Sequence, residues 1–164
     1  MKQLLLVRHG KSDWGTNAQT DFDRPLNKRG KENAPEMATR LLKRNFKFDL
    51  MVSSPAKRAL TTAQYFAEAY KTEHILLEKA IYEANTNTLL KIINAFDDHA
   101  DTIIMFGHNP GFTDFANELS NAHIYNIPTA GMVLIHFPFD SWKMVSRGTG
   151  EMVFFDYPKN SDEM

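Results

Sequence analysis

Leu4-Leu5-Leu6-Val7-Arg8-His9-Gly10 is the stretch from which the organisation of this chain can be worked out. Its four apolar residues predict a short buried strand that stops at a cation, an imidazole and a glycine. In an open α/β sheet, ligands bind just beyond the carboxyl ends of the strands. Arginine matches phosphate with a planar fork, neutral histidine can act as a nucleophile, and glycine lets a ligand approach the backbone. Three residues are a weak signal, so a phosphate site here requires matching residues further along the chain.

The composition is that of one globular domain, expected to span residues 1–164. Apolar residues make up 43% and charged residues 24% of the chain, which is ordinary for a folded protein. The net charge of −1 gives no reason to expect binding to nucleic acid or to an anionic membrane. The lack of cysteine excludes disulfides, thiolate metal sites and cysteine-dependent phosphatase mechanisms. With no signal-peptide pattern and no apolar run near the ~20 residues that span a bilayer, we expect a cytoplasmic location.

Strand and helix patterns alternate along the chain after the first strand. Further strands are predicted over residues 48–52, 75–77, 102–106, 132–137 and 152–156, with a turn over residues 141–150. Helical patterns lie between the first four of the strands. A polar loop over residues 11–24 is expected to cover the site, with Trp14 and Phe22 shielded from solvent. This alternation predicts a single-domain, three-layer α/β/α sandwich with a mostly parallel central sheet.

Two helix starts can be predicted from their capping residues. Asn27 is the expected N-cap of a helix that kinks at Pro35, for which we have no functional account. This helix is predicted to bury one face, made of Ala34, Met37, Ala38, Leu41 and Leu42. Ser54 and Pro55 predict a second start, with the serine as N-cap and the proline in the first helical position.

Two downstream positions repeat the character of the first stretch. Arg58 is expected in the first turn of the Ser-Pro helix, where free N–H groups and the helix dipole suit an anion. His108 follows the strand over residues 102–106 through a glycine, just as His9 ends the first strand. Two such histidines could meet across the floor of one pocket.

Four motifs in this order resemble the histidine phosphatase superfamily, whose fold is described as phosphoglycerate mutase-like. They are Leu6-Val7-Arg8-His9-Gly10, Asp23-Arg24-Pro25-Leu26, Ser53-Ser54-Pro55-Ala56-Lys57-Arg58-Ala59-Leu60-Thr61-Thr62-Ala63 and Gly107-His108-Asn109-Pro110-Gly111. The short chain and the Arg-Pro-Leu and Gly-His-Asn-Pro patterns look most like the SixA branch of protein phosphohistidine phosphatases. The resemblance spans nearly the whole chain, to the closing residues 155–159.

The resemblance implies a mechanism and a set of site residues. His9 would attack phosphorus and form a phosphohistidine intermediate, which water then hydrolyses. The phosphoryl oxygens would be held by Arg8, Arg24, Arg58, His108 and Ser12. Because arginines and imidazoles would supply the positive charge, no metal or other cofactor is expected, and the sequence carries no metal-ligand motif.

The proton donor to the leaving group stays open. An alkoxide is a poor leaving group that needs a positioned acid, whereas imidazole leaves more readily. By resemblance to the broader superfamily, a carboxylate downstream of Arg58 would be this acid, and Glu83 is the positional candidate. Asp21, from the loop after His9, is the alternative. Some members of the SixA branch lack the acid, so neither residue is required.

Three functions are compatible with these residues. The first is dephosphorylation of a protein phosphohistidine, favoured because the short run between Arg58 and His108 leaves no room for a long lid insertion. The second is hydrolysis of a small phosphomonoester with Glu83 as general acid. The third is a non-catalytic phosphate-recognising domain, which would be expected to lose His9 or an arginine.

Overall fold

The computed structural model describes residues 1–14 and 20–160. A single six-stranded sheet has the order β3-β2-β4-β1-β5-β6. Its strands are β1 (Lys2–Arg8), β2 (Leu50–Ser53), β3 (Leu76–Leu77), β4 (Thr102–Gly107), β5 (Met132–Phe137) and β6 (Glu151–Asp156). Strands β1 to β4 pair in parallel, while β5 and β6 are antiparallel, so the sheet is mostly parallel as predicted.

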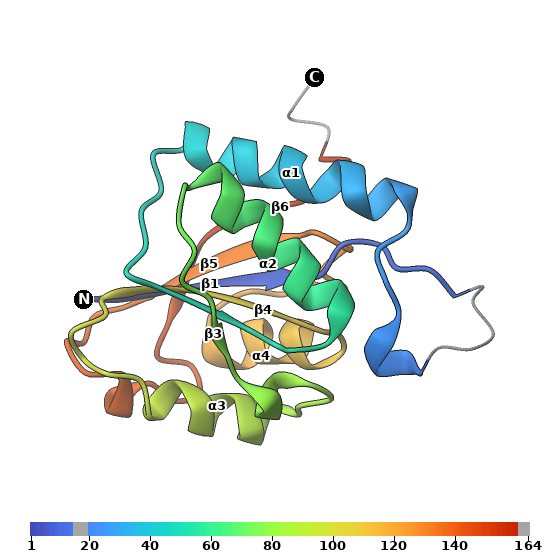
Figure 1. Cartoon of the computed structure of the whole chain (residues 1–164). Coiled ribbons are helices and arrows are strands. Elements are labelled where there is room, and N and C mark those ends of the chain that lie inside the picture. Colours follow the sequence, from blue (N-terminus) through green and yellow to red (C-terminus); the bar gives the residue numbers. More distant parts are fainter. Residues whose placement is uncertain (15–19, 161–164) are drawn as a thin grey trace.

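Helices cover both faces of this sheet and complete the predicted three layers (Figure 1). They are α1 (Lys28–Lys43), α2 (Lys57–Ala69), α3 (Thr86–Asn94) and α4 (Gly111–Leu119). Alternate residues of β1 belong to two separate hydrophobic cores. Leu5 and Val7 pack with α1 and α2, whereas Leu4 and Leu6 pack with α3 and α4. Because β1 is buried on both faces, its sequence is a continuous apolar run and does not alternate between apolar and polar residues.

Short 3-10 turns complete the described chain: η1 (Asp21–Asp23), η2 (Lys79–Ile81) and η3 (Trp142–Met144). The predicted turn over residues 141–150 therefore contains a buried tryptophan. None of the helices in residues 1–14 and 20–160 combines the length and apolar character that crossing a bilayer requires.

The first predicted helix is confirmed in its start and wrong in one packing detail. Asn27 caps α1, and its side chain accepts a hydrogen bond from the Gly30 N–H. Helix α1 runs without interruption past Pro35, and the predicted kink stays a prediction. Leu42 is 39% exposed, because it lies at the edge of the apolar stripe that Met37, Ala38 and Leu41 bury.

The predicted start of the second helix is wrong. Helix α2 begins at Lys57 with Ala56 as its N-cap, two residues later than the Ser-Pro pattern predicts. The Ser54 hydroxyl does accept a hydrogen bond from the Ala56 N–H at 3.2 Å, but it also lies 2.8 Å from His108 Nε2. The Ser54 hydroxyl therefore contacts both the turn before α2 and the side chain of His108, the residue after β4.

Two further expectations are corrected at the surface. The strand predicted over residues 75–77 is only two residues long in the structure, β3. Both of its leucines are 51% exposed, because β3 lies at the edge of the sheet. Trp14 is 79% exposed and Phe22 37% exposed, so neither is covered as expected. The Trp14 ring packs on the Arg24 guanidinium. Part of the predicted loop over residues 11–24, residues 15–19, lies outside the described chain.

Candidate active site

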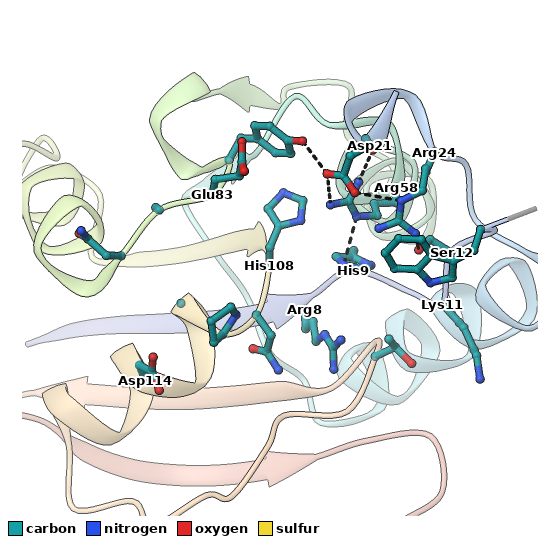
Figure 2. A pocket seen from close by; sticks show the side chains of 18 of the residues that line it. Arg8, His9, Lys11, Ser12, Asp21, Arg24, Arg58, Glu83, His108 and Asp114 are labelled. Atoms are coloured by element: carbon teal, nitrogen blue, oxygen red, sulfur yellow. Dashed lines mark hydrogen bonds and ion pairs between the residues drawn. The ribbon is translucent and has the colours of Figure 1, made fainter. Parts of the chain in front are cut away.

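The site lies at the carboxyl ends of β1 and β4, which are neighbours in the sheet. Arg8 pairs in register with Gly107, and the His9 N–H donates to the Gly107 carbonyl at 3.0 Å. The next residues, His9 and His108, therefore lie side by side, with ring centroids 5.2 Å apart (Figure 2). This juxtaposition confirms the expectation that the two histidines meet.

Glycine is required at the end of β4 by close packing. A Cβ atom at Gly107 would lie 2.4 Å from the ring of Phe112 and 2.8 Å from Ile81. A larger residue would have to displace the buried Phe112 ring, which belongs to the first turn of α4. The glycine that precedes the second histidine thus leaves room for this ring against the strand end.

His9 is held in one tautomer. Its Nδ1 lies 2.6 Å from the carbonyl oxygen of Gly10, and a carbonyl can only accept, so Nδ1 carries the proton and donates it. The lone pair is then on Nε2, to which Arg58 donates through its Nε–H at 3.3 Å. Burial lowers the pKa of His9 to about 3, so the ring is neutral at physiological pH. A neutral imidazole is a nucleophile through such a lone pair, which here accepts the Arg58 hydrogen bond.

His108 has a different environment on the other side of the site. Its Nε2 lies 2.8 Å from the Ser54 hydroxyl, and its buried Nδ1 has no hydrogen-bond partner among the described residues. Burial lowers the pKa of this ring to about 3 as well, with Arg58 as the next cause. A neutral ring whose Nδ1 lacks a partner can donate to or accept from a bound group.

Three arginines surround the two rings. Arg58, from the first turn of α2, is 6% exposed, and Arg24, from the segment after η1, is 9% exposed. Arg8 donates through Nη1 to the Ile127 carbonyl at 2.8 Å, and its buried Nε has no partner among the described residues. Three guanidiniums close together favour an anionic ligand.

Ser12 and Arg24 are brought together by the return of the loop after β1. Ser12 and Leu26 form an isolated antiparallel bridge, and the Asn27 N–H donates to the Lys11 carbonyl at 2.9 Å. In consequence Arg24 Nη1 donates to the Ser12 hydroxyl at 2.5 Å.

All the predicted site residues line one cavity of about 770 Å³. They are Arg8, His9, Ser12, Asp21, Arg24, Arg58, Glu83 and His108. Glu83 lies at the exposed rim with a left-handed backbone conformation, φ 57°, which is uncommon for a residue other than glycine. Among the residues that the structure describes, no group of three or more acidic or histidine side chains could hold a metal ion.

No role was predicted from the sequence for Tyr82, which lines the cavity, or for Thr62, which contacts the cavity residue Arg58. Tyr82 donates its hydroxyl to Asp21 Oδ2 at 2.5 Å and packs edge-on against the His108 ring, 5.5 Å between centroids. Thr62 accepts from the Gly10 N–H at 2.9 Å and donates to the Arg58 carbonyl at 2.8 Å. Thr62 lies in the quoted Ser-Pro motif and Tyr82 beside Glu83, but neither has a local signal for these contacts.

The two buried histidines predict an acid-sensitive fold. The unfolded chain binds their protons near pH 6.5, whereas the folded chain binds them only near pH 3. Between these two pH values, unfolding therefore takes up protons. The free energy of unfolding is highest above pH 6.5 and falls as the pH decreases below that value. Each histidine contributes at most about 1.4 kcal/mol per pH unit. Urea unfolding from about pH 7 to about pH 5 measures the slope.

The matched variants separate the histidines from other titrating groups. His9→Gln and His108→Gln should each flatten this slope, because glutamine takes up no proton on unfolding. His74→Gln, at an exposed position, should leave it unchanged. Equal slopes in all of these proteins would contradict the assignment.

Two neutral imidazoles and three guanidiniums around one cavity make a site suited to a phosphoryl group. The sequence matches the family model of the histidine phosphatase superfamily (branch 1) over residues 4–107. The chain therefore belongs to the histidine phosphatase superfamily, whose members are phosphatases and mutases.

Particular relatives share the fold or part of the sequence. A putative phosphohistidine phosphatase SixA from Agrobacterium tumefaciens superposes with a TM-score of 0.79 and 25% identity, covering 96% of this chain and 98% of that one. An uncharacterized chloroplastic protein of Arabidopsis thaliana is 28% identical over 152 residues, 87% of this chain and 69% of that protein. A 2,3-bisphosphoglycerate-dependent phosphoglycerate mutase of Buchnera aphidicola is 37% identical over 82 residues, 49% of this chain but only 36% of the mutase.

Proposed function

We propose that this protein is a metal-independent phosphatase with His9 as its nucleophile. Nε2 of His9 attacks phosphorus, the bond to the leaving group breaks, and a phosphohistidine forms on the enzyme. Water then attacks the same phosphorus, which releases inorganic phosphate and restores the neutral imidazole. The observation that carries this proposal is the hydrogen bond of His9 Nδ1 to the Gly10 carbonyl, which leaves the Nε2 lone pair beside Arg58 in a cationic cavity.

The surrounding donors would hold the transferring group. Arg8, Arg24, Arg58, Ser12 and His108 line the same cavity, and charge-assisted hydrogen bonds to phosphoryl oxygens are the strong kind. Preorganised donors of this type stabilise the charge that shifts in a phosphoryl-transfer transition state. Because the three arginines among them carry positive charge, the proposal includes no metal ion or other cofactor.

We propose a phosphohistidine side chain on another protein as the substrate. The likeness to a putative SixA phosphohistidine phosphatase over 96% of the chain supports this. Between Arg58 and His108 the chain forms only the rest of α2, a two-residue strand, η2, α3 and β4, so no inserted domain covers the cavity there. A side chain presented on a protein surface could therefore enter.

A small phosphomonoester is the second candidate substrate. The position and backbone conformation of Glu83 favour it. Glu83 lines the cavity and has a left-handed backbone conformation that costs energy, and such conformations concentrate at functional sites. A carboxyl acid there could protonate an alkoxide leaving group. A phosphate-recognising domain without turnover is the third candidate.

Substrate preference is tested by phosphate release in the presence of a chelator. The substrates are a phosphohistidine-carrying protein and a panel of small phosphomonoesters, each also incubated with Glu83→Gln. We expect phosphohistidine to be cleaved with the higher kcat/KM and Glu83→Gln to leave that reaction within about threefold, because imidazole leaves without a strong acid. Preference for an ester, with a large loss in Glu83→Gln, would instead assign a metabolite phosphatase. If neither substrate is turned over, the third candidate, a phosphate-recognising domain without catalysis, would be the remaining function.

A further inference from the structure

Asp21 lies at the centre of a hydrogen-bonded cluster beside the nucleophile (Figure 2). Its Oδ1 accepts from Arg24 Nε at 3.0 Å, and its Oδ2 accepts from Arg58 Nη2 at 3.1 Å and from the Tyr82 hydroxyl at 2.5 Å. The backbone carbonyl of Asp21 accepts from Arg58 Nη1 at 2.7 Å. One residue of η1 thus contacts two arginines and a tyrosine from three different segments.

We propose that Asp21, held by Tyr82, is a positioning residue that orients Arg24 and Arg58 toward the phosphoryl group, and that it is not the proton donor. This inference rests on the proposed phosphatase function and deepens it. Asp21 is one of the two candidate acids of the site, and its contacts indicate a different role for it.

The orientation of Arg58 depends on both oxygens that Asp21 offers. Its two Nη atoms are taken by the Asp21 carbonyl and carboxylate, and the third nitrogen, Nε, is then directed at His9 Nε2. An arginine side chain has many rotamers in solution, so holding one edge of the fork removes that freedom before substrate binds. Without Asp21, the guanidinium would have to be ordered by the phosphate itself.

Charge gives a second reason for a carboxylate at this place. Arg8, Arg24 and Arg58 line one cavity, and like charges at close range repel. The Asp21 carboxylate lies between the guanidiniums of Arg24 and Arg58 and offsets that repulsion. It therefore keeps two cations close enough to grip one phosphoryl group.

Tyr82 fixes the carboxylate in turn. It follows η2, and its ring packs edge-on against Phe22, the neighbour of Asp21 in η1, with centroids 5.2 Å apart. The same ring packs against His108. Tyr82 thereby ties the segment of Asp21 to the β4 side of the site, although the two residues lie 61 positions apart in sequence.

The same contacts argue against a role as general acid. The Tyr82 hydroxyl, with Arg24 and Arg58 as further causes, lowers the pKa of Asp21 to about 2. At neutral pH the carboxyl group is then protonated in roughly one molecule in 10⁵, so it has almost no proton to donate. The charged and titratable groups that face it are Arg24, Arg58, Tyr82 and, farther off, His108.

The experiment measures binding and turnover separately. Calorimetry gives the affinity of the full chain for inorganic phosphate, which requires no catalysis. Kinetics then compare p-nitrophenyl phosphate, with a good leaving group, and glycerol phosphate, with a poor one. The variants are Asp21→Asn and Tyr82→Phe, with Asp23→Asn as the matched control, since Asp23 lies in the same turn and outside the cavity.

We expect Asp21→Asn to bind phosphate roughly tenfold to hundredfold more weakly and to lose kcat/KM equally for both esters. Tyr82→Phe should show about a threefold to tenfold loss, and none in an Asp21→Asn background, because it acts through the carboxylate. Asp23→Asn should match the wild type. Thermal unfolding of each variant shows that it is folded.

Three results would overturn the inference. Phosphate binding that is unchanged or tighter in Asp21→Asn would mean that the carboxylate only competes with phosphate for the arginines. A loss confined to glycerol phosphate would identify Asp21 as the acid. Full additivity of Tyr82→Phe and Asp21→Asn would remove the link between them. If the wild type binds phosphate but hydrolyses neither these esters nor a phosphohistidine-carrying protein, the proposed function fails, while the phosphate affinities still decide the role of Asp21.

Discussion

His9→Ala is expected to lower kcat at least about 10⁴-fold on any substrate that the wild type hydrolyses. The reason is that the proposed reaction has no other route to the covalent intermediate. His108 is a second imidazole, with its ring centroid 5.2 Å from that of His9, but the proposal assigns it to binding the phosphoryl oxygens. The measurement is phosphate release under saturating substrate, together with acid-labile, alkali-stable phosphoryl labelling of the protein after a rapid quench.

The control is His74→Ala, at an exposed histidine away from the cavity, which should keep both turnover and labelling. Folding of His9→Ala is checked by its thermal unfolding, because loss of a buried ring can destabilise a core. Turnover that persists in a folded His9→Ala protein would rule out the covalent mechanism.

Arg58→Ala is expected to lower kcat/KM by about 10²- to 10³-fold, the effect of removing a preorganised donor from a site of developing charge. Arg58 is 6% exposed and contacts His9 and Asp21, so its removal affects the nucleophile, the phosphate grip and the Asp21 cluster together. Arg58→Lys keeps the charge but not the planar fork and should recover only part of the rate. Steady-state kinetics on the substrate preferred by the wild type measures both.

Lys57→Ala provides the matched comparison for Arg58. It removes a cation from the same first turn of α2, but Lys57 is exposed and lies outside the cavity. We expect its kcat/KM to stay within about twofold of the wild type, since a solvated surface charge is screened. If Lys57→Ala and Arg58→Ala lose the same rate, the effect is a general one of helix charge, and the role proposed for Arg58 is wrong.

Much of the fold and of the cavity lining could be predicted from local sequence. The Leu4–Val7 run predicts a central strand because such a strand is apolar on both faces, and Asn27 predicts a helix start because its cap reaches only three residues ahead. His9, Arg58 and His108 each follow a strand pattern, and parallel strands place their carboxyl ends at one edge. The catalytic roles of these three residues stay proposals that the variants at each position test.

Tertiary structure alone decided the contacts that join distant segments. Ser54 looks like a helix cap, but the neighbouring β4 brings His108 within hydrogen-bond distance of its hydroxyl. Tyr82 has no local signal, since its partner Asp21 belongs to a loop on the other side of the site. Leu42 and Trp14 are exposed. Their exposure could not be predicted, because periodicity and residue type do not say how far a neighbouring element extends.

The physical reason is the range of the interactions involved. Strand and helix patterns and caps depend on residues within a few positions of each other, so the amino-acid sequence by itself determined the order of elements and the end of the sheet at which the histidines and arginines gather. The strand order β3-β2-β4-β1-β5-β6 sets which side chains meet there. The tautomer of His9 follows from the backbone carbonyl of the next residue, Gly10. The contacts of Asp21 with Arg58 and Tyr82 exist only because η1, α2 and the residue after η2 converge on one cavity.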